Sequence, residues 1–189
     1  IFTAPSGIDE NIIVKREWKE KERIKVLTCG QFIKRKNIDK VILACKNFKN
    51  IDLTVIGSGK MEHQLKKLSS NVKFTGQIPH EKVIKIMRES DIFILPSVNE
   101  TFGMVYLEAM ASGCITVCAQ NDGIDGIIKD SVNGFLAAPD TPGIESCLKK
   151  IFAFTPKSEI LENAYNTIWD YTSDKTAESY LNSALIPSL

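Results

Sequence analysis

Short apolar runs alternate along the chain with longer stretches in which apolar positions recur every three or four residues. The short runs are continuously apolar and rich in β-branched residues, which is typical of strands covered on both faces. This pattern predicts six strands, at residues 24–29, 51–56, 72–75, 91–95, 115–119 and 134–137.

The stretches between these strands have the spacing of amphipathic helices. We expect helices at residues 38–48, 61–68, 81–89 and 102–111, separated from the strands by turns that contain Gly, Pro, Asp or Asn. From about residue 141 the pattern becomes helical throughout, over residues 142–152, 157–169 and 172–185.

This alternation predicts an α/β fold, a doubly wound Rossmann-like parallel sheet of about six strands with C-terminal helices. Right-handed crossovers favour the strand order 3-2-1-4-5-6. The 189 residues fit a single domain. We divide it into a lead-in at residues 1–23, an α/β core at 24–154 and terminal helices at 155–189.

Composition and charge exclude several classes of function. With 24 Lys and Arg against 23 Asp and Glu, the chain has no strong general attraction for nucleic acid or an anionic membrane. No apolar run approaches the roughly 20 residues of a membrane-spanning helix. The charged run at residues 15–23 carries both signs, which favours a solvated helix or loop over a binding surface.

The cysteines lie mostly in apolar segments, which predicts buried free thiols in a reducing compartment. The chain has only two histidines, so a zinc site is disfavoured even though two of the cysteines are four residues apart. The residues concerned are Cys29, Cys45, Cys114, Cys118, Cys147, His63 and His80.

In an open parallel sheet, ligands bind beyond the carboxyl ends of the strands where the winding direction reverses. The predicted order places this crevice between the first and fourth strands, at the loops 30–37 and 96–103. In the first loop, Gly30 allows a sharp turn, and Lys34, Arg35 and Lys36 precede a helix. Cations beside free backbone N–H groups suit phosphate, and a solvated basic turn is the alternative.

The second loop carries Glu100 and Gly103 and leads into a helix that carries Glu108. On a continuous helix, the two glutamates would be about 12 Å apart at about 1.5 Å per residue. That separation is similar to the span from a hexose to a ribose across a diphosphate. Two carboxylates at this spacing can accept sugar hydroxyls, with glycine allowing close approach between them. Helix capping by Glu100 and a surface position for Glu108 are the alternatives.

Other nucleotide-binding and catalytic motifs are incomplete. Phe32 and Arg35 stand where a dinucleotide fingerprint after Gly30 needs glycines, and Glu62 stands in the third place after Gly57-Ser58-Gly59. There is no complete P-loop and no Gly-x-Ser-x-Gly elbow. A Rossmann-type dehydrogenase is therefore disfavoured.

Residues 100–113, Glu-Thr-Phe-Gly-Met-Val-Tyr-Leu-Glu-Ala-Met-Ala-Ser-Gly, resemble the E-x7-E segment of the family-four glycosyltransferases. These are retaining sugar transferases with the GT-B fold. Residues 91–97 and 72–79 resemble the strands and the base-binding turn of the same family, and residues 5–9 are similar to its interdomain connection. The resemblance covers residues 5 to about 181 and is to the C-terminal, donor-binding half of the fold.

The resemblance implies a nucleotide-sugar-binding domain of a retaining glycosyltransferase. Such an enzyme transfers a hexose from a nucleoside-diphosphate sugar to a glycan or lipid-linked acceptor, here in surface polysaccharide synthesis. The N-terminal acceptor domain is absent, so the isolated domain is expected to be inactive. No metal or other cofactor is expected. The full-length enzyme is expected in the cytoplasm, with peripheral association at the inner face of the membrane, and nucleic acid is not an expected partner. The alternatives are an epimerase of the same fold and a non-catalytic nucleotide-sugar-binding module.

The resemblance also implies roles for the two acidic residues. Glu100 is the expected catalytic residue and holds hydroxyls of the donor sugar, while Glu108 binds the ribose hydroxyls. The segment between them faces the sugar and the diphosphate with its backbone and comprises Thr101, Phe102, Gly103 and Met104.

The resemblance implies that the remaining donor contacts come from three other loops. Lys36, helped by Arg35, would neutralise the diphosphate beside Gly30. The backbone around Ile78 would meet the nucleotide base, and Gly57 would leave room for that base.

Two departures from the family pattern bear on donor identity and activity. The usual Gly-Arg pair is Gly30-Gln31 here, so one phosphate-binding cation is missing, and Lys34 or Arg35 is a candidate replacement. The usual Gly-Gly-x-x-Glu segment reads Asp-Gly-Ile-Asp-Gly at residues 122–126, which places Gly126 where the family has glutamate.

Overall fold

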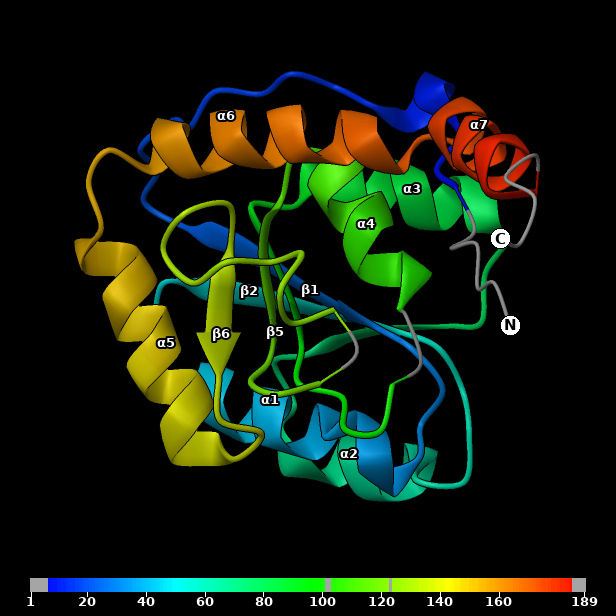
Figure 1. Cartoon of the computed structure of the whole chain (residues 1–189). Coiled ribbons are helices and arrows are strands. Elements are labelled where there is room, and N and C mark those ends of the chain that lie inside the picture. Colours follow the sequence, from blue (N-terminus) through cyan, green and yellow to red (C-terminus); the bar gives the residue numbers. More distant parts are fainter. Residues whose placement is uncertain (1–6, 101–102, 123, 185–189) are drawn as a thin grey trace.

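A computed structural model describes residues 7–100, 103–122 and 124–184. It contains a six-stranded, wholly parallel sheet in the order β3-β2-β1-β4-β5-β6, as predicted (Figure 1). The strands are β1 (Ile24–Cys29), β2 (Ile51–Ile56), β3 (Lys73–Gly76), β4 (Ile92–Leu95), β5 (Ile115–Ala119) and β6 (Phe135–Ala137). Each lies within one residue of its predicted bounds. The doubly wound α/β fold is therefore confirmed.

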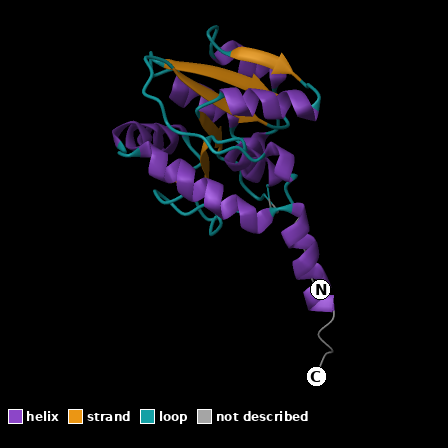
Figure 2. Ribbon diagram, turned by 90° about the horizontal axis from the view of Figure 1, so that it is seen from above, coloured by secondary structure: helices purple, strands orange, loops and turns teal. Residues whose placement is uncertain are grey.

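Helices cover both faces of this sheet (Figure 1). In one group α1 packs on both α2 and α5, and in the other α4 packs on both α3 and α6. Their bounds are α1 (Ile38–Cys45), α2 (Glu62–Leu68), α3 (His80–Glu89), α4 (Met104–Ala111), α5 (Thr141–Ala153) and α6 (Lys157–Ile168). A final helix, α7 (Ser173–Ala184), projects away from the body (Figure 2). Three 3-10 turns complete the described chain, η1 (Glu10–Ile12), η2 (Lys34–Lys36) and η3 (Trp169–Tyr171).

Two predicted helices end early because their last turns tighten. The helix predicted at residues 38–48 ends at Cys45, after which Asn47 and Phe48 donate to carbonyls three residues back. The helix predicted at 157–169 ends at Ile168 and continues as η3. Such tightening satisfies carbonyls that an α-helix leaves without partners at its end.

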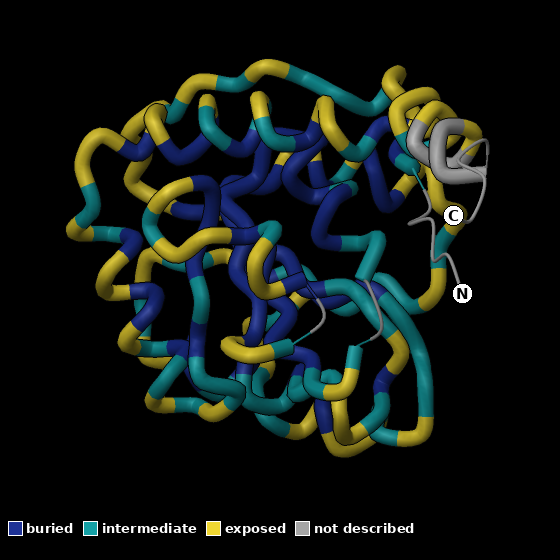
Figure 3. Tube along the Cα trace, viewed as in Figure 1, coloured by how far each residue is buried: buried dark blue, intermediate teal, exposed yellow. Residues whose placement is uncertain are grey.

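The core lies in the middle of the sheet, where the trace is continuously buried (Figure 3). All of β4 is buried, and Phe93 packs edge-to-face on Tyr106 of α4, with ring centroids 6.0 Å apart. The predicted buried thiols are also found: all five cysteines are free, and four are buried. Burial raises the pKa of the Cys114 thiol to about 12. These thiols are therefore protonated at neutral pH and are poor nucleophiles.

The lead-in is tied to the C-terminal part of the described chain. Ile8 forms a parallel bridge with Thr172, donating its N–H to the Tyr171 carbonyl and accepting from the Ser173 N–H. A Cβ on Gly7 would lie 2.2 Å from the Ser173 Cα, so only glycine permits this approach. The beginning of the described chain and the start of α7 are thus held at one corner of the molecule.

After η1, the charged segment at residues 15–23 is extended and mostly exposed, in agreement with a solvated loop. Asp91, whose side chain is only 3% exposed, holds it against the amino end of β4. The Asp91 carboxylate accepts hydrogen bonds from Arg16 Nη2 (2.9 Å), Lys21 Nζ (2.5 Å) and the Lys25 N–H (2.9 Å). One buried carboxylate therefore joins the segment to the first and fourth strands.

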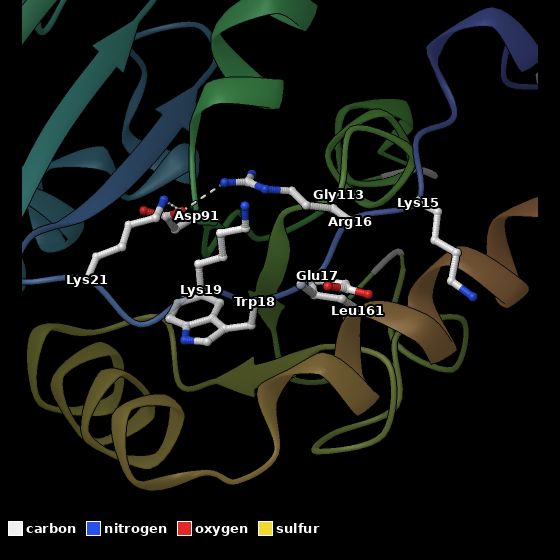
Figure 4. A pocket seen from close by; sticks show the side chains of 9 residues that line it. All are labelled: Lys15, Arg16, Glu17, Trp18, Lys19, Lys21, Asp91, Gly113 and Leu161. Atoms are coloured by element: carbon white, nitrogen blue, oxygen red, sulfur yellow. Dashed lines mark hydrogen bonds and ion pairs between the residues drawn. The ribbon is translucent and has the colours of Figure 1, made fainter.

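The same segment lines a hollow of about 660 Å³ at the amino ends of the strands (Figure 4). Four cations and Trp18 line it, but Asp91 pairs with Arg16 and Lys21, and Glu162 pairs with Lys15. The local charge is therefore largely compensated. Because ligands of such sheets bind at the opposite, carboxyl edge, we place the candidate site there.

We expect Asp91→Asn to lower the free energy of unfolding by about 1–3 kcal/mol, because the amide can no longer satisfy three donors at once. Urea unfolding followed by circular dichroism measures this loss. Glu17→Gln, which removes an exposed carboxylate from the same segment, is the matched control and should change little. Equal unfolding free energies for the two variants would contradict the assigned role of Asp91.

Candidate functional site

The two loops that the sequence singles out meet at the carboxyl ends of β1 and β4. Leu27 of β1 lies opposite Phe93 of β4, so the two strands end side by side. The loops are then joined directly: the Val98 N–H donates to the Arg35 carbonyl at 2.8 Å, and Asn37 Nδ2 donates to the Pro96 carbonyl at 2.8 Å. The two loops predicted to line the crevice are therefore adjacent and bonded to each other, and we refer to their junction as the crevice.

The basic loop sends its charges across this crevice. Its cations form the 3-10 turn η2, and Asn37, with φ +51°, leads from that turn into α1. Lys36 is only 12% exposed, and its Nζ forms an ion pair with Glu100 Oε2. Arg35 Nη1 lies 3.4 Å from the same oxygen. The alternative of a freely solvated basic turn is therefore wrong for Lys36.

Glu100 receives all of these contacts on one oxygen. Ser97 Oγ donates to Oε2 at 2.8 Å, in addition to the two cations. Within the described part of the chain, Oε1 has no hydrogen-bond partner. The described residues therefore fix the carboxylate through Oε2 and leave Oε1 unengaged.

Electrostatics keep this carboxylate ionised. Partial burial acts to raise the pKa of Glu100, but hydrogen bonds from Lys36 and Ser97 and the charges of Lys36 and Arg35 outweigh it. The pKa of Glu100 is therefore held below its ordinary value of 4.5. At neutral pH, Glu100 is an anion that can accept hydroxyl protons in hydrogen bonds.

Glu108 lies on α4 and is 17% exposed, so it is not a plain surface residue. Its Oε1 lies 2.9 Å from His80 Nε2, at the first residue of α3. The sequence did not identify His80 as part of the site. The available signal was its position directly after the turn of Ile78.

Glu100 lies in the loop before α4, as predicted, but α4 begins at Met104 instead of residue 102. The separation of about 12 Å that a continuous helix would give therefore does not apply to Glu100 and Glu108. Gly103 has φ +75°, a left-handed conformation that ends the loop rather than continuing a helix. A Cβ there would lie 2.5 Å from the Tyr106 ring. The capping alternative is also unsupported, because the Glu100 carboxylate is engaged by Lys36 and Ser97.

A hollow of about 400 Å³ lies beside the crevice, at the carboxyl ends of β1 and β2. It brings together three predicted positions, Gly30, Gly57 and Ile78, and adds Gln31, Ser58 and Gln77. Its lining is mainly backbone and uncharged side chains. Such a lining suits a flat, uncharged ring better than a phosphate.

Three glycines line this hollow, and the structure gives new reasons for two of them, Gly57 and Gly30. A Cβ on Gly57, at φ +136°, would lie 1.9 Å from the Gly30 carbonyl oxygen, so the close approach of two backbones requires glycine there. The chain bends at Gly30, as expected, but without a positive φ. A Cβ on Gly30 would only touch the side chains of Lys36 and Leu95 at 3.8–3.9 Å.

A further acidic residue, Asp122, reaches the site from the loop after β5. Its Oδ1 accepts from the Glu100 N–H at 2.7 Å and its Oδ2 from the Asn99 N–H at 2.5 Å. The sequence identified residues 122–126 as a departure but not this contact. The available signal was an acidic residue at the carboxyl end of the strand next to β4.

The structure describes two of the four remaining predicted residues. Gly103 and Met104 lie at the start of α4, between the two glutamates along the chain. Thr101 and Phe102 lie outside the described residues, so the roles predicted for them stay predictions. Across residues 7–100, 103–122 and 124–184, no helix is both long and apolar enough to cross a membrane.

Comparison with known proteins identifies the family that the chain resembles. The family model described as "Glycosyl transferases group 1" matches residues 9–162. An uncharacterized glycosyltransferase of Methanocaldococcus jannaschii is 30% identical over 83% of this chain and 43% of its own length. The amylovoran biosynthesis glycosyltransferase AmsK of Erwinia amylovora is 32% identical over 60% of this chain and 32% of its own length. The chain spans less than half the length of these relatives.

Solved structures show the same fold. The crystal structure of Anabaena Alr3699/HepE in complex with UDP matches with a TM-score of 0.80 at 19% identity, over 94% of this chain and 55% of that chain. The C-terminal domain of a glycosyl transferase group 1 family protein (LpcC) from Francisella tularensis matches with a TM-score of 0.73 at 22% identity. That match covers 86% of this chain and 97% of the other.

From the ion pair of Lys36 and Glu100 we predict how the pKa of Glu100 and the stability of the fold at low pH depend on Lys36. Lys36→Met should raise the pKa of Glu100, because the hydrogen bond and the positive charge that lower it are lost. A carboxyl with a lowered pKa stabilises the fold above its unfolded-state pKa and loses that contribution as pH falls through its folded pKa. The variant should therefore lose less stability than the unmodified chain between neutral pH and about pH 3.

Carboxyl ¹³C titration by NMR measures the shift directly. Lys34→Met is the matched control, since Lys34 belongs to the same 3-10 turn but has no hydrogen bond or ion pair with Glu100. A Glu100 pKa that does not move in Lys36→Met, or that moves equally in both variants, would contradict the assigned pairing.

Proposed function

The chain belongs to the group 1 glycosyl transferase family, and we propose that it is the donor-binding half of a retaining hexosyltransferase. The donor is a nucleoside-diphosphate sugar, and the acceptor is a glycan or a lipid-linked glycan. The observation that carries this proposal is the crevice between β1 and β4, where two cations and one available carboxylate oxygen lie together.

The sugar end of the donor is assigned to Glu100. Its Oε2 is bound by Lys36 and Ser97, so Oε1 can accept a hexose hydroxyl without rearrangement of the carboxylate. A carboxylate held in advance recognises hydroxyls more selectively than a freely rotating one, because its ordering entropy is already lost on folding. This supports Glu100 as the residue that contacts the transferred sugar.

The diphosphate is assigned to the basic loop. Lys36 and Arg35 already face the crevice from η2, and a doubly charged ligand attracts both of them in competition with Glu100. These cations also stabilise the charge on the departing diphosphate during transfer. No metal is needed for that role, and the independence from metal stays a prediction.

The nucleoside is assigned to Glu108 and the neighbouring hollow. Glu108 accepts the ribose hydroxyls in place of His80, and the base enters the hollow beside Gly30 and Ile78. A uridine donor is supported by the solved structure of HepE, which is a complex with UDP. Which base the donor carries is tested by the thermal-shift series below.

The acceptor side is assigned to residues outside this chain. The chain spans less than half of its curated relatives, and the matched LpcC structure is a C-terminal domain. We therefore expect the isolated chain to bind donor without transferring sugar. Surface polysaccharide synthesis, supported by the name of the AmsK relative, and peripheral association of the full-length enzyme with the inner face of the cytoplasmic membrane belong to the same proposal.

A non-catalytic nucleotide-sugar-binding module is the second candidate. Gln31 lines the hollow at the position where the family has a cation, which favours weaker stabilisation of a leaving phosphate. Release of nucleoside diphosphate by the full-length protein in the presence of acceptor would exclude this candidate.

A thermal-shift series with UDP, GDP, ADP and their glucose esters tests donor binding. One nucleotide should raise the unfolding temperature of the chain, because a ligand that binds only the native state stabilises it. Its glucose ester should raise that temperature further. If none of the six compounds shifts the transition at millimolar concentration, the proposed function is wrong.

Variants of the two glutamates should affect different parts of donor binding, Glu108 the nucleoside diphosphate and Glu100 the sugar. Glu108→Ala should weaken the selected nucleoside diphosphate by about 1–3 kcal/mol, the cost of losing a charged hydrogen bond. Glu100→Ala should leave nucleoside-diphosphate affinity unchanged or tighter, because Lys36 is released, and should abolish the additional affinity of the sugar ester. Calorimetry on both variants measures this; the reverse pattern would exchange the two assignments.

A further inference from the structure

The loop that carries Glu100 is held from behind by a second carboxylate. Asn99 has φ +57°, so the turn at residues 99–100 directs two successive backbone N–H groups to the same side. Such pairs of N–H groups form small anion-binding concavities. The Asp122 carboxylate occupies this one, with one oxygen on the Asn99 N–H (2.5 Å) and the other on the Glu100 N–H (2.7 Å).

This contact acts on Glu100 at a different point from Lys36 and Ser97. Those two side chains fix one oxygen of the Glu100 carboxylate, whereas Asp122 fixes the backbone from which the side chain departs. A side chain anchored at both its backbone and one terminal oxygen has little freedom left. The direction of Oε1 therefore depends on both anchors.

We propose that Asp122 is a positioning residue for recognition of the donor sugar, acting through Glu100. The inference rests on the proposed function, because it concerns the sugar that Glu100 is assigned to hold. Asp122 sets the affinity gained from the sugar and leaves the affinity for the nucleoside diphosphate to the other loops. It thereby makes the loop after β5 a part of donor selection.

A carboxylate is suited to holding two backbone N–H groups. The two N–H groups are bonded to separate oxygens of Asp122, and an ionised carboxylate presents both oxygens as acceptors. An asparagine of the same shape supplies one oxygen and presents an N–H₂ group to the other donor. Asp122→Asn therefore breaks one of the two bonds with little change in volume.

The experiment compares UDP with UDP-glucose by calorimetry on the chain, or the corresponding pair for whichever base the thermal-shift series selects. Asp122→Asn should reduce the ratio of the two affinities by about five- to tenfold, as expected for one lost hydrogen bond, and leave UDP itself within about twofold. Asp125→Asn is the matched control. It removes the same charge from the same loop, but Asp125 accepts from the Asn121 N–H and does not contact the loop after β4 in the described structure.

A double variant tests whether the effect passes through Glu100. In a Glu100→Ala background the sugar-dependent gain is already absent, so adding Asp122→Asn should change the affinity ratio no further. An independent, additional loss in the double variant would overturn the inference. So would a single Asp122→Asn variant that weakens UDP and UDP-glucose equally, because that result indicates a merely structural role.

A measurement on the unmodified chain does not depend on whether the variant folds. The amides of Asn99 and Glu100 should exchange with deuterium about tenfold or more slowly than unstructured amides, because both are bonded to Asp122. Unprotected amides would overturn the inference even if donor binds. If the wild-type chain binds neither compound, the proposed function is wrong. If it binds both and Asp122→Asn does not change the ratio of the two affinities, only this inference is wrong.

Discussion

The geometry of the site depends on how the loop after β4 is held between its two neighbours. From the β1 side, the Arg35 carbonyl and the Asn37 amide bond to that loop, and from the β5 side the Asp122 carboxylate does so. A loop at the edge of a sheet otherwise has only water to satisfy its backbone groups. Because both walls contribute, Glu100 has a defined position before any ligand arrives.

Charge within the crevice follows from the same arrangement. Lys36 and Glu100 are both largely withdrawn from water, and each offsets the desolvation of the other. Removing one partner leaves the second as a buried charge without compensation. A ligand that carries its own negative charge can take over the lysine and free the carboxylate, so the ligand-free pairing and the proposed bound state use the same side chains.

The fold was predictable because its signals are local. Runs such as residues 92–95 are apolar on both faces, which identifies central parallel strands, and the fixed handedness of crossovers then determines their order. The site was predictable only where it coincides with strand ends, as for Lys36 and Glu100. The start of α4 was misjudged because the left-handed conformation of Gly103 is a property of the backbone, and apolar periodicity does not report it.

The contacts that sequence reasoning missed join different loops. His80 meets Glu108 across 28 positions, and Asp122 meets Glu100 across 22. Such pairings depend on how far each loop extends beyond its strand, which composition does not determine. The reason for Gly57 was missed likewise, since the backbone that it must avoid belongs to Gly30.

The bridge between Ile8 and Thr172 has a mechanical consequence. A tension applied at the start of the described chain is carried first by its bonds to Tyr171 and Ser173, not by the central sheet. It therefore loads α7, which projects from the body, before it reaches the next bonds along the chain, from Arg88 to the Asn11 carbonyl and from the Val14 N–H to the Ala111 carbonyl. The same corner lines a hollow together with His80 and Glu108, so a displacement of α7 is transmitted to the nucleoside end of the proposed site.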